Sequence, residues 1–136
     1  MCGLLGMLAA TGNVDQYVDA LERSLPCMRH RGPDAAGTWH DGDAAFGFNR
    51  LSIIDLEHSH QPLRWGPEDN PERYALTFNG EIFNYVELRE ELHRRGHRFR
   101  TSSDTEVIVH AWQEWGEACF ERFNGLVAQM SVLPFV

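Results

Sequence analysis

Lysine is missing from the 136-residue sequence, so all 12 basic side chains are arginines. A phosphate-binding loop of the Walker type depends on a lysine, and no such ATP site can be assembled from this sequence. The formal net charge is −8, and the arginines are scattered apart from one short run at residues 94–98. Such a charge distribution disfavours binding to a phosphate backbone, so we predict no nucleic-acid partner.

Cysteine is scarce as well, and the three that occur are Cys2, Cys27 and Cys119. Because the number is odd and no Cys-x-x-Cys pair is present, the sequence predicts neither a disulfide framework nor a structural zinc site. His58 and His60 have ligand-like spacing, but no third ligand lies near them, and we predict no metal site. Unpaired thiols are typical of a reducing compartment.

Long apolar runs are also missing from the sequence. No stretch reaches the roughly 18 to 20 residues of a membrane span, and the N-terminus lacks the basic and apolar regions of a signal peptide. We therefore expect a cytoplasmic protein with no membrane partner. The composition, 43% hydrophobic and 24% charged, is that of a soluble globular protein, and the length fits one domain.

Met1-Cys2-Gly3 is the first stretch that suggests chemistry. Removal of Met1 would leave Cys2 with a thiol and a free α-amine on one residue. A thiol with a pKa near 8.5 is mostly protonated at neutral pH, whereas an α-amine with a pKa near 7.7 to 8.0 can accept its proton. Residues 3–8 predict a short buried strand that would hold this terminus in place. So short a motif is weak evidence, and the nucleophile hypothesis depends on other residues.

The first half of the chain further predicts a helix and a hairpin. Apolar residues recur at helical spacing from a start near Asp15, and Pro26 is expected to end the helix. Those apolar residues are Val14, Val18, Leu21 and Leu25. Residues 37–40 and 44–49 are predicted as two strands joined at Asp41-Gly42, a strong hairpin signal.

The second half predicts a strand, a helix, a short strand and another helix. Residues 74–78 are rich in β-forming residues and are expected to end in a sharp turn at Asn79-Gly80. The short strand is expected at residues 97–100. The expected helix caps are Asn84 with Glu87 and Ser103 with Glu106, and the expected helix stops are Gly96 and Gly116. This order of elements predicts an α+β layered fold.

Five segments, taken together and in order, resemble one protein family. They are Met1-Cys2-Gly3-Leu4-Leu5-Gly6, His30-Arg31-Gly32-Pro33-Asp34, Arg50-Leu51-Ser52-Ile53-Ile54-Asp55, Phe78-Asn79-Gly80-Glu81-Ile82-Phe83-Asn84 and Ser103-Asp104-Thr105-Glu106. The sequence resembles the N-terminal glutaminase domain of glutamine-hydrolysing asparagine synthetases, which are class II glutamine amidotransferases. The resemblance implies an α+β fold, the four-layer αββα sandwich of N-terminal-nucleophile hydrolases, incomplete at its C-terminal end.

The resemblance also implies how the chain is divided. Residues 1–125 correspond to part of the glutaminase domain, whereas residues 126–136 diverge from the family pattern as a C-terminal tail. The ATP-dependent synthetase domain has no counterpart in the sequence. The resemblance therefore implies no cofactor for this chain, with ATP and Mg²⁺ expected only in the synthetase domain.

The resemblance implies that Cys2 is the catalytic nucleophile. Cys2 would attack the side-chain amide of glutamine, form a thioester and release ammonia, and water would then release glutamate. Asn79 and the backbone N–H of Gly80 would stabilise the oxyanion of the tetrahedral intermediate. Taken without the family, an Asn-Gly pair is more simply interpreted as a turn.

Substrate-binding roles follow from the same resemblance. Arg50 would hold the α-carboxylate of glutamine in a bidentate contact, and Glu81 and Asp104 would accept its α-ammonium. Backbone groups along residues 50–54 would complete the cradle. The implied substrate-binding residues are Arg50, Leu51, Ser52, Ile53, Ile54, Asn79, Gly80, Glu81 and Asp104. An acidic residue such as Asp104 in the first turn of a helix is also explained by the helix dipole.

Two other functional hypotheses stay open at the level of sequence. The chain could be a catalytically silent remnant or an interaction fragment that at most binds glutamine. It could also belong to a related amidotransferase with another acceptor. The expected partners are glutamine and a synthetase domain or subunit supplied separately.

Overall fold

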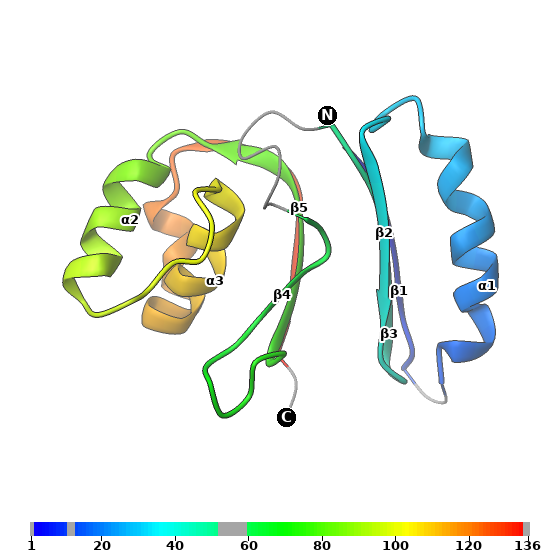
Figure 1. Cartoon of the computed structure of the whole chain (residues 1–136), viewed down its shortest axis with the longest axis horizontal. Coiled ribbons are helices and arrows are strands. Elements are labelled where there is room, and N and C mark those ends of the chain that lie inside the picture. Colours follow the sequence, from blue (N-terminus) through cyan, green and yellow to red (C-terminus); the bar gives the residue numbers. More distant parts are fainter. Residues whose placement is uncertain (1, 11–12, 52–59, 135–136) are drawn as a thin grey trace. The chain divides into compact units, whose positions relative to one another are not determined.

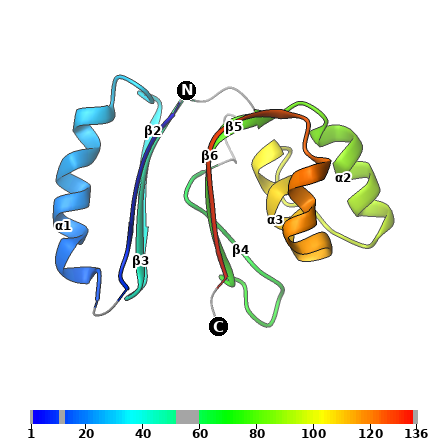
Figure 2. The same ribbon diagram turned by 180° about the vertical axis from the view of Figure 1, so that it is seen from behind.

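The computed structural model describes the backbone of residues 2–10, 13–51 and 60–134, with side chains described as far as residue 127. Internal contacts divide the chain into two compact units. Unit 1 comprises residues 1–52 and 60–62, and unit 2 comprises residues 53–59 and 63–136. Figures 1 and 2 show that each unit has a sheet with helical cover.

Unit 1 is an antiparallel sheet covered by one helix. The sheet has the strand order β1-β3-β2, so β3 is central and hydrogen-bonded along both edges. Helix α1 packs along one face of this sheet (Figure 1). Its elements are β1 (Gly3–Leu8), α1 (Asp15–Ser24), a 3₁₀ helix (Leu25–Met28), β2 (Ala35–His40) and β3 (Ala44–Arg50).

The sequence patterns of unit 1 are mostly confirmed. Helix α1 ends at Ser24, and Pro26 lies in the 3₁₀ helix that follows. The hairpin between β2 and β3 turns at the Asp41-Gly42 pair. The predicted strand at residues 3–8 is confirmed as β1, but its predicted burial was wrong, because β1 is an edge strand with alternating exposure and its Leu8 is 68% exposed.

Unit 2 is a second antiparallel sheet, in the order β4-β5-β6, with β5 central. Helices α2 and α3 lie on the same side of this sheet in both views (Figures 1 and 2). The core joins β5 to the inner faces of the two helices through Leu76, Leu92 and Ile108. The elements are β4 (Leu63–Trp65), β5 (Tyr74–Ile82), α2 (Tyr85–Arg94), α3 (Asp104–Trp115), a 3₁₀ helix (Gly116–Arg122) and β6 (Gly125–Pro134).

The predicted turn at Asn79-Gly80 was wrong. Strand β5 continues through this pair to Ile82, because β6 lies beside it and supplies hydrogen-bonding partners along its whole length. The pair instead marks an irregularity in the ladder, since Asn79 pairs with Gln129 whereas Gly80 pairs with Val127. One residue of β6 is therefore extra at this point, as in a β-bulge.

Two further local predictions need correction. Residues 97–100 do not form a strand, because the Arg100 N–H donates to the carboxylate of Glu106 and not to a neighbouring strand. Asn84 precedes α2 without capping it: its amide donates to Arg122 O and accepts from Asn124 N–H. By contrast, the Ser103 hydroxyl accepts from Glu106 N–H at 3.2 Å, as a helix cap does.

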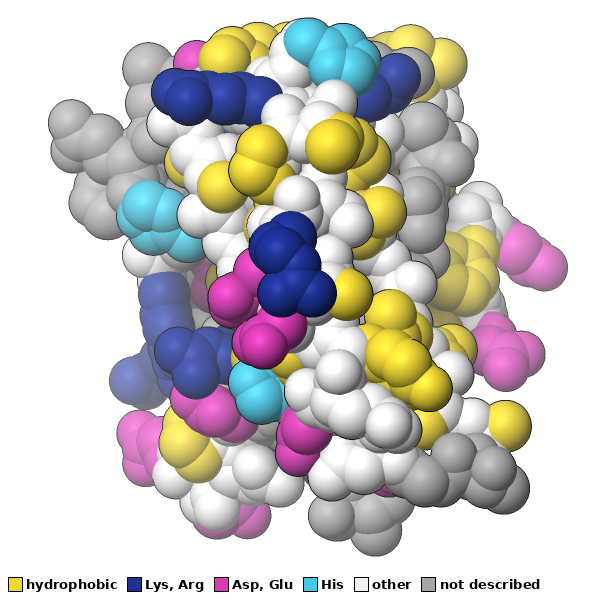
Figure 3. Space-filling view, turned by 90° about the vertical axis from the view of Figure 1, so that its right-hand side faces the viewer, with side chains coloured by type: hydrophobic (Ala, Val, Ile, Leu, Met, Phe, Trp, Pro, Cys, Tyr) yellow, Lys and Arg dark blue, Asp and Glu magenta, His cyan; other side chains and the backbone are white. Residues whose placement is uncertain are grey.

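The α+β class is confirmed, because each unit packs helices against an antiparallel sheet. Among the helices that the structure describes, none has the length and apolarity of a membrane span. Figure 3 shows acidic, basic and apolar side chains intermingled on the face that it presents. The predicted domain end at residue 125 coincides with the start of β6 and stays a prediction.

Candidate active site

The sheet register of unit 1 brings the expected nucleophile beside the expected carboxylate clamp. Strand β1 runs antiparallel to β3, with Gly3 opposite Asn49. Cys2 therefore leaves β1 at the end where Arg50 completes β3. Arg50 is only 5% exposed.

The Cys2 sulfur is held by the backbone that follows β3. The Leu51 N–H donates to Cys2 Sγ at 3.3 Å, and the thiol lies 3.7 Å from Leu51 O. An N–H aimed at sulfur can stabilise negative charge that develops on it, as a nucleophilic thiolate requires. The sulfur is partly buried, and so both a fixed position and an approach for a substrate are available to it.

The loop at residues 30–34 ties the two strand ends together. Arg31 Nε donates to the Cys2 carbonyl at 3.1 Å, and the Asp34 N–H donates to the Arg50 carbonyl at 3.0 Å. Gly32 lies against the backbone of β3, where a Cβ atom would overlap the Asn49 carbonyl and lie 2.6 Å from Arg50 N. Only glycine fits this close approach without displacing the loop.

Two residues with positioning roles were missed in the sequence reasoning. Arg31 fixes the backbone of Cys2, although no role was assigned to it. Asn49 is buried, and its side-chain amide donates to Leu25 O at 2.6 Å, which joins β3 to the 3₁₀ helix after α1. The only sequence signal was the position of these residues within or beside the family segments, because a buried asparagine in a strand has no periodic pattern of its own.

Unit 2 carries the expected oxyanion donors at the irregularity in β5. Asn79 is 8% exposed, whereas Gly80 is exposed beside it. A Cβ atom on Gly80 would overlap the Leu126 carbonyl and lie 2.7 Å from the Phe78 ring. The backbone of Gly80 is therefore exposed at the irregularity, whereas a side chain at this position would collide with its neighbours. A glycine of this kind is typical of a place where a ligand approaches the backbone closely.

The expected ammonium acceptors, Glu81 and Asp104, lie together in unit 2. Asp104 opens α3 and is 6% exposed, and its Oδ2 accepts the Ile82 N–H at 3.0 Å. Burial raises the pKa of Asp104, hydrogen bonds from Ile82 and Thr105 oppose that rise, and the charge of Glu81 adds to it. A cation placed between the two carboxylates would relieve their repulsion, which favours an ammonium ligand.

The remaining predicted site residues are placed as follows. Leu51 contacts Cys2 as described above, whereas Ser52, Ile53, Ile54 and His58 lie outside the described residues. The other predicted site residues divide between the units, with Cys2 and Arg50 in unit 1 and Asn79, Gly80, Glu81 and Asp104 in unit 2. Among the described residues, no three His, Cys, Asp or Glu side chains are arranged to hold a metal ion.

Comparison with known families matches residues 1–131 to the glutamine amidotransferase domain. The chain belongs to this family. A protein of Mycobacterium tuberculosis assigned as a glutamine-hydrolysing asparagine synthetase is 50% identical over 139 aligned residues, which cover 94% of this chain. Asparagine synthetase 1 of Bacillus subtilis is 42% identical over 94% of the chain. The chain spans 21% and 20% of the lengths of these two relatives.

Solved structures of amidotransferases have a fold similar to that of this domain. The glutamine phosphoribosylpyrophosphate amidotransferase of Bacillus subtilis aligns with a TM-score of 0.55 and 26% identity, over 69% of this chain and 22% of that one. A second match, described as the allosteric regulatory enzyme of purine biosynthesis, has a TM-score of 0.54. The fold class is therefore that of the N-terminal-nucleophile amidotransferases, as the sequence segments implied.

Proposed function

We propose that this amidotransferase domain hydrolyses glutamine to glutamate and ammonia with Cys2 as the nucleophile. The proposal is carried by one observation: the Leu51 N–H lies 3.3 Å from Cys2 Sγ at the strand end that also carries the buried Arg50. The family match and the similarity to glutamine-hydrolysing asparagine synthetases support the same assignment.

The proposed reaction has two halves. The Cys2 thiol transfers its proton to the α-amine, and its sulfur attacks the side-chain carbonyl carbon of glutamine. Asn79 and the Gly80 N–H stabilise the oxyanion, an effect worth about 3 to 4 kcal/mol for each donor. The proton then passes to the leaving nitrogen, and ammonia departs as the thioester forms. Water attacks the thioester, glutamate leaves and the thiol is restored.

The substrate backbone is recognised by groups of opposite charge. Arg50 holds the α-carboxylate, and backbone groups from Leu51 to Ile54 line the same end of the substrate. Glu81 and Asp104 accept the α-ammonium. The two carboxylates repel each other, and a bound cation would relieve that repulsion. No cofactor takes part in these steps. In the longer relatives the ammonia would pass to aspartate activated by ATP and Mg²⁺ in a separate synthetase part, and aspartate is the acceptor that we propose.

Ammonia release tests the proposal directly. The purified chain is incubated with glutamine, and ammonia is measured beside a Cys2→Ala variant. We expect release only from the chain with Cys2, and only after Met1 has been removed, which intact-mass measurement reports. If both proteins release ammonia equally, Cys2 is not the nucleophile. If neither does while both bind glutamine in calorimetry, the chain is a binding fragment.

An Asp104→Asn variant tests the ammonium site. Loss of a hydrogen bond to a charged group costs about 1.5 to 3 kcal/mol, so kcat/KM should fall by about 10- to 150-fold. Asp69→Asn removes the same charge from an exposed loop and is the matched control. Equal kcat/KM in the two variants would remove Asp104 from the proposed site, provided that both remain folded.

A further inference from the structure

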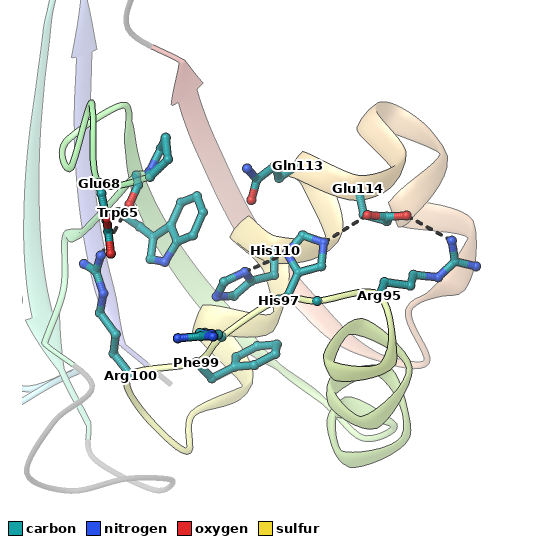
Figure 4. A pocket seen from close by; sticks show the side chains of 13 residues that line it. Trp65, Glu68, Arg95, His97, Phe99, Arg100, His110, Gln113 and Glu114 are labelled. Carbon is teal, nitrogen blue, oxygen red and sulfur yellow. Dashed lines mark hydrogen bonds and ion pairs between the residues drawn. The ribbon is translucent and has the colours of Figure 1, made fainter.

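Unit 2 contains a cavity of about 670 Å³ that none of the proposed glutaminase residues lines. It lies between the segment that follows α2 and the loop that follows β4, with α3 at its base. Figure 4 shows the rings of Trp65, His97 and His110 between two arginines, Arg95 on one side and Arg100 on the other.

A chain of polar contacts crosses the base of this cavity. Glu114 Oε2 lies 2.9 Å from His97 Nε2, and the Nδ1 atoms of His97 and His110 are 3.0 Å apart. His110 Nε2 lies 3.5 Å from Glu106 Oε1. His110 and Glu106 are each 1% exposed, so water does not compete with the inner end of the chain.

Counting hydrogens along this chain shows that all three contacts are favourable only when the histidine pair holds one added proton, although His110 Nε2, at 3.5 Å from Glu106, makes no hydrogen bond. Each of the three contacts needs one hydrogen on a ring nitrogen, because a lone pair facing a carboxylate or another lone pair is repulsive. Two neutral imidazoles supply only two such hydrogens. The carboxylates do not supply the third: hydrogen bonds from His97 and Arg95 lower the pKa of Glu114. Burial would raise the pKa of Glu106, but the nearby His110 ring and hydrogen bonds from Thr101 lower it to about 2.

Burial lowers the pKa of His110, whereas His97 lies nearer the surface and beside Glu114. With both nitrogens protonated, His97 donates to Glu114 and to His110 Nδ1, and the His110 Nε2–H faces Glu106. The charged groups around the pair, on all elements packed against it, are Glu68, Arg89, His93, Arg95, Arg98, Arg100, Glu106 and Glu114.

The cavity is positive even without the added proton, within a chain whose formal net charge is −8. Three arginines and two glutamates line it. Of these, Arg95 is already paired with Glu114. Arg98 makes no hydrogen bond or ion pair within the described residues, and Arg100 donates only a long bond of 3.4 Å from its guanidinium to Gly66 O. Two guanidinium groups are thus available to a ligand.

We propose that this cavity is a second ligand site, which binds a small organic molecule through an oxyanion, either a carboxylate or a phosphate group. Arg98 and Arg100 donate hydrogen bonds to the oxyanion, and the protonated His97–His110 pair contributes charge from below. An anion in the cavity stabilises the added proton on the pair, so binding is coupled to uptake of that proton. The site is independent of the glutaminase residues and does not depend on the proposed function.

Calorimetry with two probes tests the site and separates the two chemistries. Benzoate presents a carboxylate, and inorganic phosphate presents a phosphate. We expect saturable binding of at least one, and the tighter probe identifies the class. An Arg98→Gln, Arg100→Gln double variant should bind about tenfold or more weakly. Arg23→Gln with Arg94→Gln removes the same charge from exposed positions outside the cavity and should bind as the unchanged chain does.

Proton coupling is measured with benzoate, which stays ionised across the range used. We expect tighter binding at about pH 6 than at about pH 8, by about threefold or more. The difference should disappear in a His97→Gln variant that remains folded by circular dichroism. No saturable binding of either probe at about 10 mM, or equal affinity in the two arginine double variants, overturns the site. Equal affinity for benzoate at both pH values overturns the coupling.

Discussion

Replacing Gly32 with alanine should disturb the candidate nucleophile without touching it. The added Cβ would overlap the Asn49 carbonyl and lie 2.6 Å from Arg50 N, both on the backbone of a central strand. A central strand cannot shift by this amount without losing its ladder, so the loop at residues 30–34 must move instead. That movement separates Arg31 from the Cys2 carbonyl and Asp34 from the Arg50 carbonyl.

The size of the effect follows from these contacts. Forcing an extra methyl group into a packed site costs about 1 to 3 kcal/mol. Each of the two hydrogen bonds contributes about 0.5 to 1.5 kcal/mol. The Gly32→Ala variant should therefore lose about 2 to 6 kcal/mol of the free energy of unfolding, a large part of the roughly 5 to 15 kcal/mol typical of a domain.

Denaturant unfolding and ammonia release measure the two consequences. Gly42→Ala is the matched control, because a Cβ at Gly42 would meet only the Asn13 side chain, at 3.8 Å or more. We expect Gly32→Ala to unfold at lower denaturant and to release less ammonia per folded molecule, while Gly42→Ala resembles the unchanged chain. If the two variants unfold within about 0.5 kcal/mol of each other, the loop does not lock the strand ends as described.

Three further outcomes are expected. Ser103→Ala removes the hydroxyl that accepts Glu106 N–H, and the free energy of unfolding should fall by about 1 kcal/mol in denaturant titration, whereas Ser24→Ala should change it little. The pKa of Glu106 is about 2 in the folded chain against an ordinary 4.5, so its stabilisation is full above pH 4.5 and is lost as the pH falls toward 2. The loss of unfolding free energy between pH 4.5 and pH 2 is on the order of 3 kcal/mol and should be smaller in a Glu106→Gln variant. The same loss in both proteins would contradict this account. Burial raises the pKa of Cys119 to about 11, so iodoacetamide should label the exposed Cys27 in the native chain and Cys119 only after unfolding, as peptide mass spectrometry would show.

Sequence patterns predicted unit 1 well because its signals are local. Helix α1 follows from apolar spacing and from Pro26, and the hairpin follows from Asp41-Gly42. The edge position of β1 was not predictable in this way, because neighbouring strands decide whether a strand is buried. The contact between Cys2 and Leu51 spans 49 residues and was not predicted, because no local pattern joins residues so far apart; the family resemblance only assigned both residues to one site.

In unit 2 the errors share one physical cause, which is that distant partners overrode local preference. Asn79-Gly80 has the composition of a turn, but β6 pairs with it across about 50 residues and keeps it in a strand. Asn84 has the composition of a helix cap, but its amide is occupied by Arg122 and Asn124. The cap at Ser103 was predictable because the hydroxyl and the Glu106 N–H that it accepts are only three residues apart in the sequence.

The two strands that carry the proposed substrate-binding residues, β3 and β5, are each central in a three-stranded sheet. Arg50 at the end of β3 pairs with Ala35 of β2, and Glu81 near the end of β5 pairs with Leu126 of β6, so each inherits its backbone position from a ladder. Cys2 precedes β1, which is an edge strand with only one neighbour. The nucleophile therefore depends on contacts outside the sheet, from Arg31 to its carbonyl and from Leu51 to its sulfur. The loop at residues 30–34 supplies the first of these, and its damage should affect Cys2 before it affects Arg50.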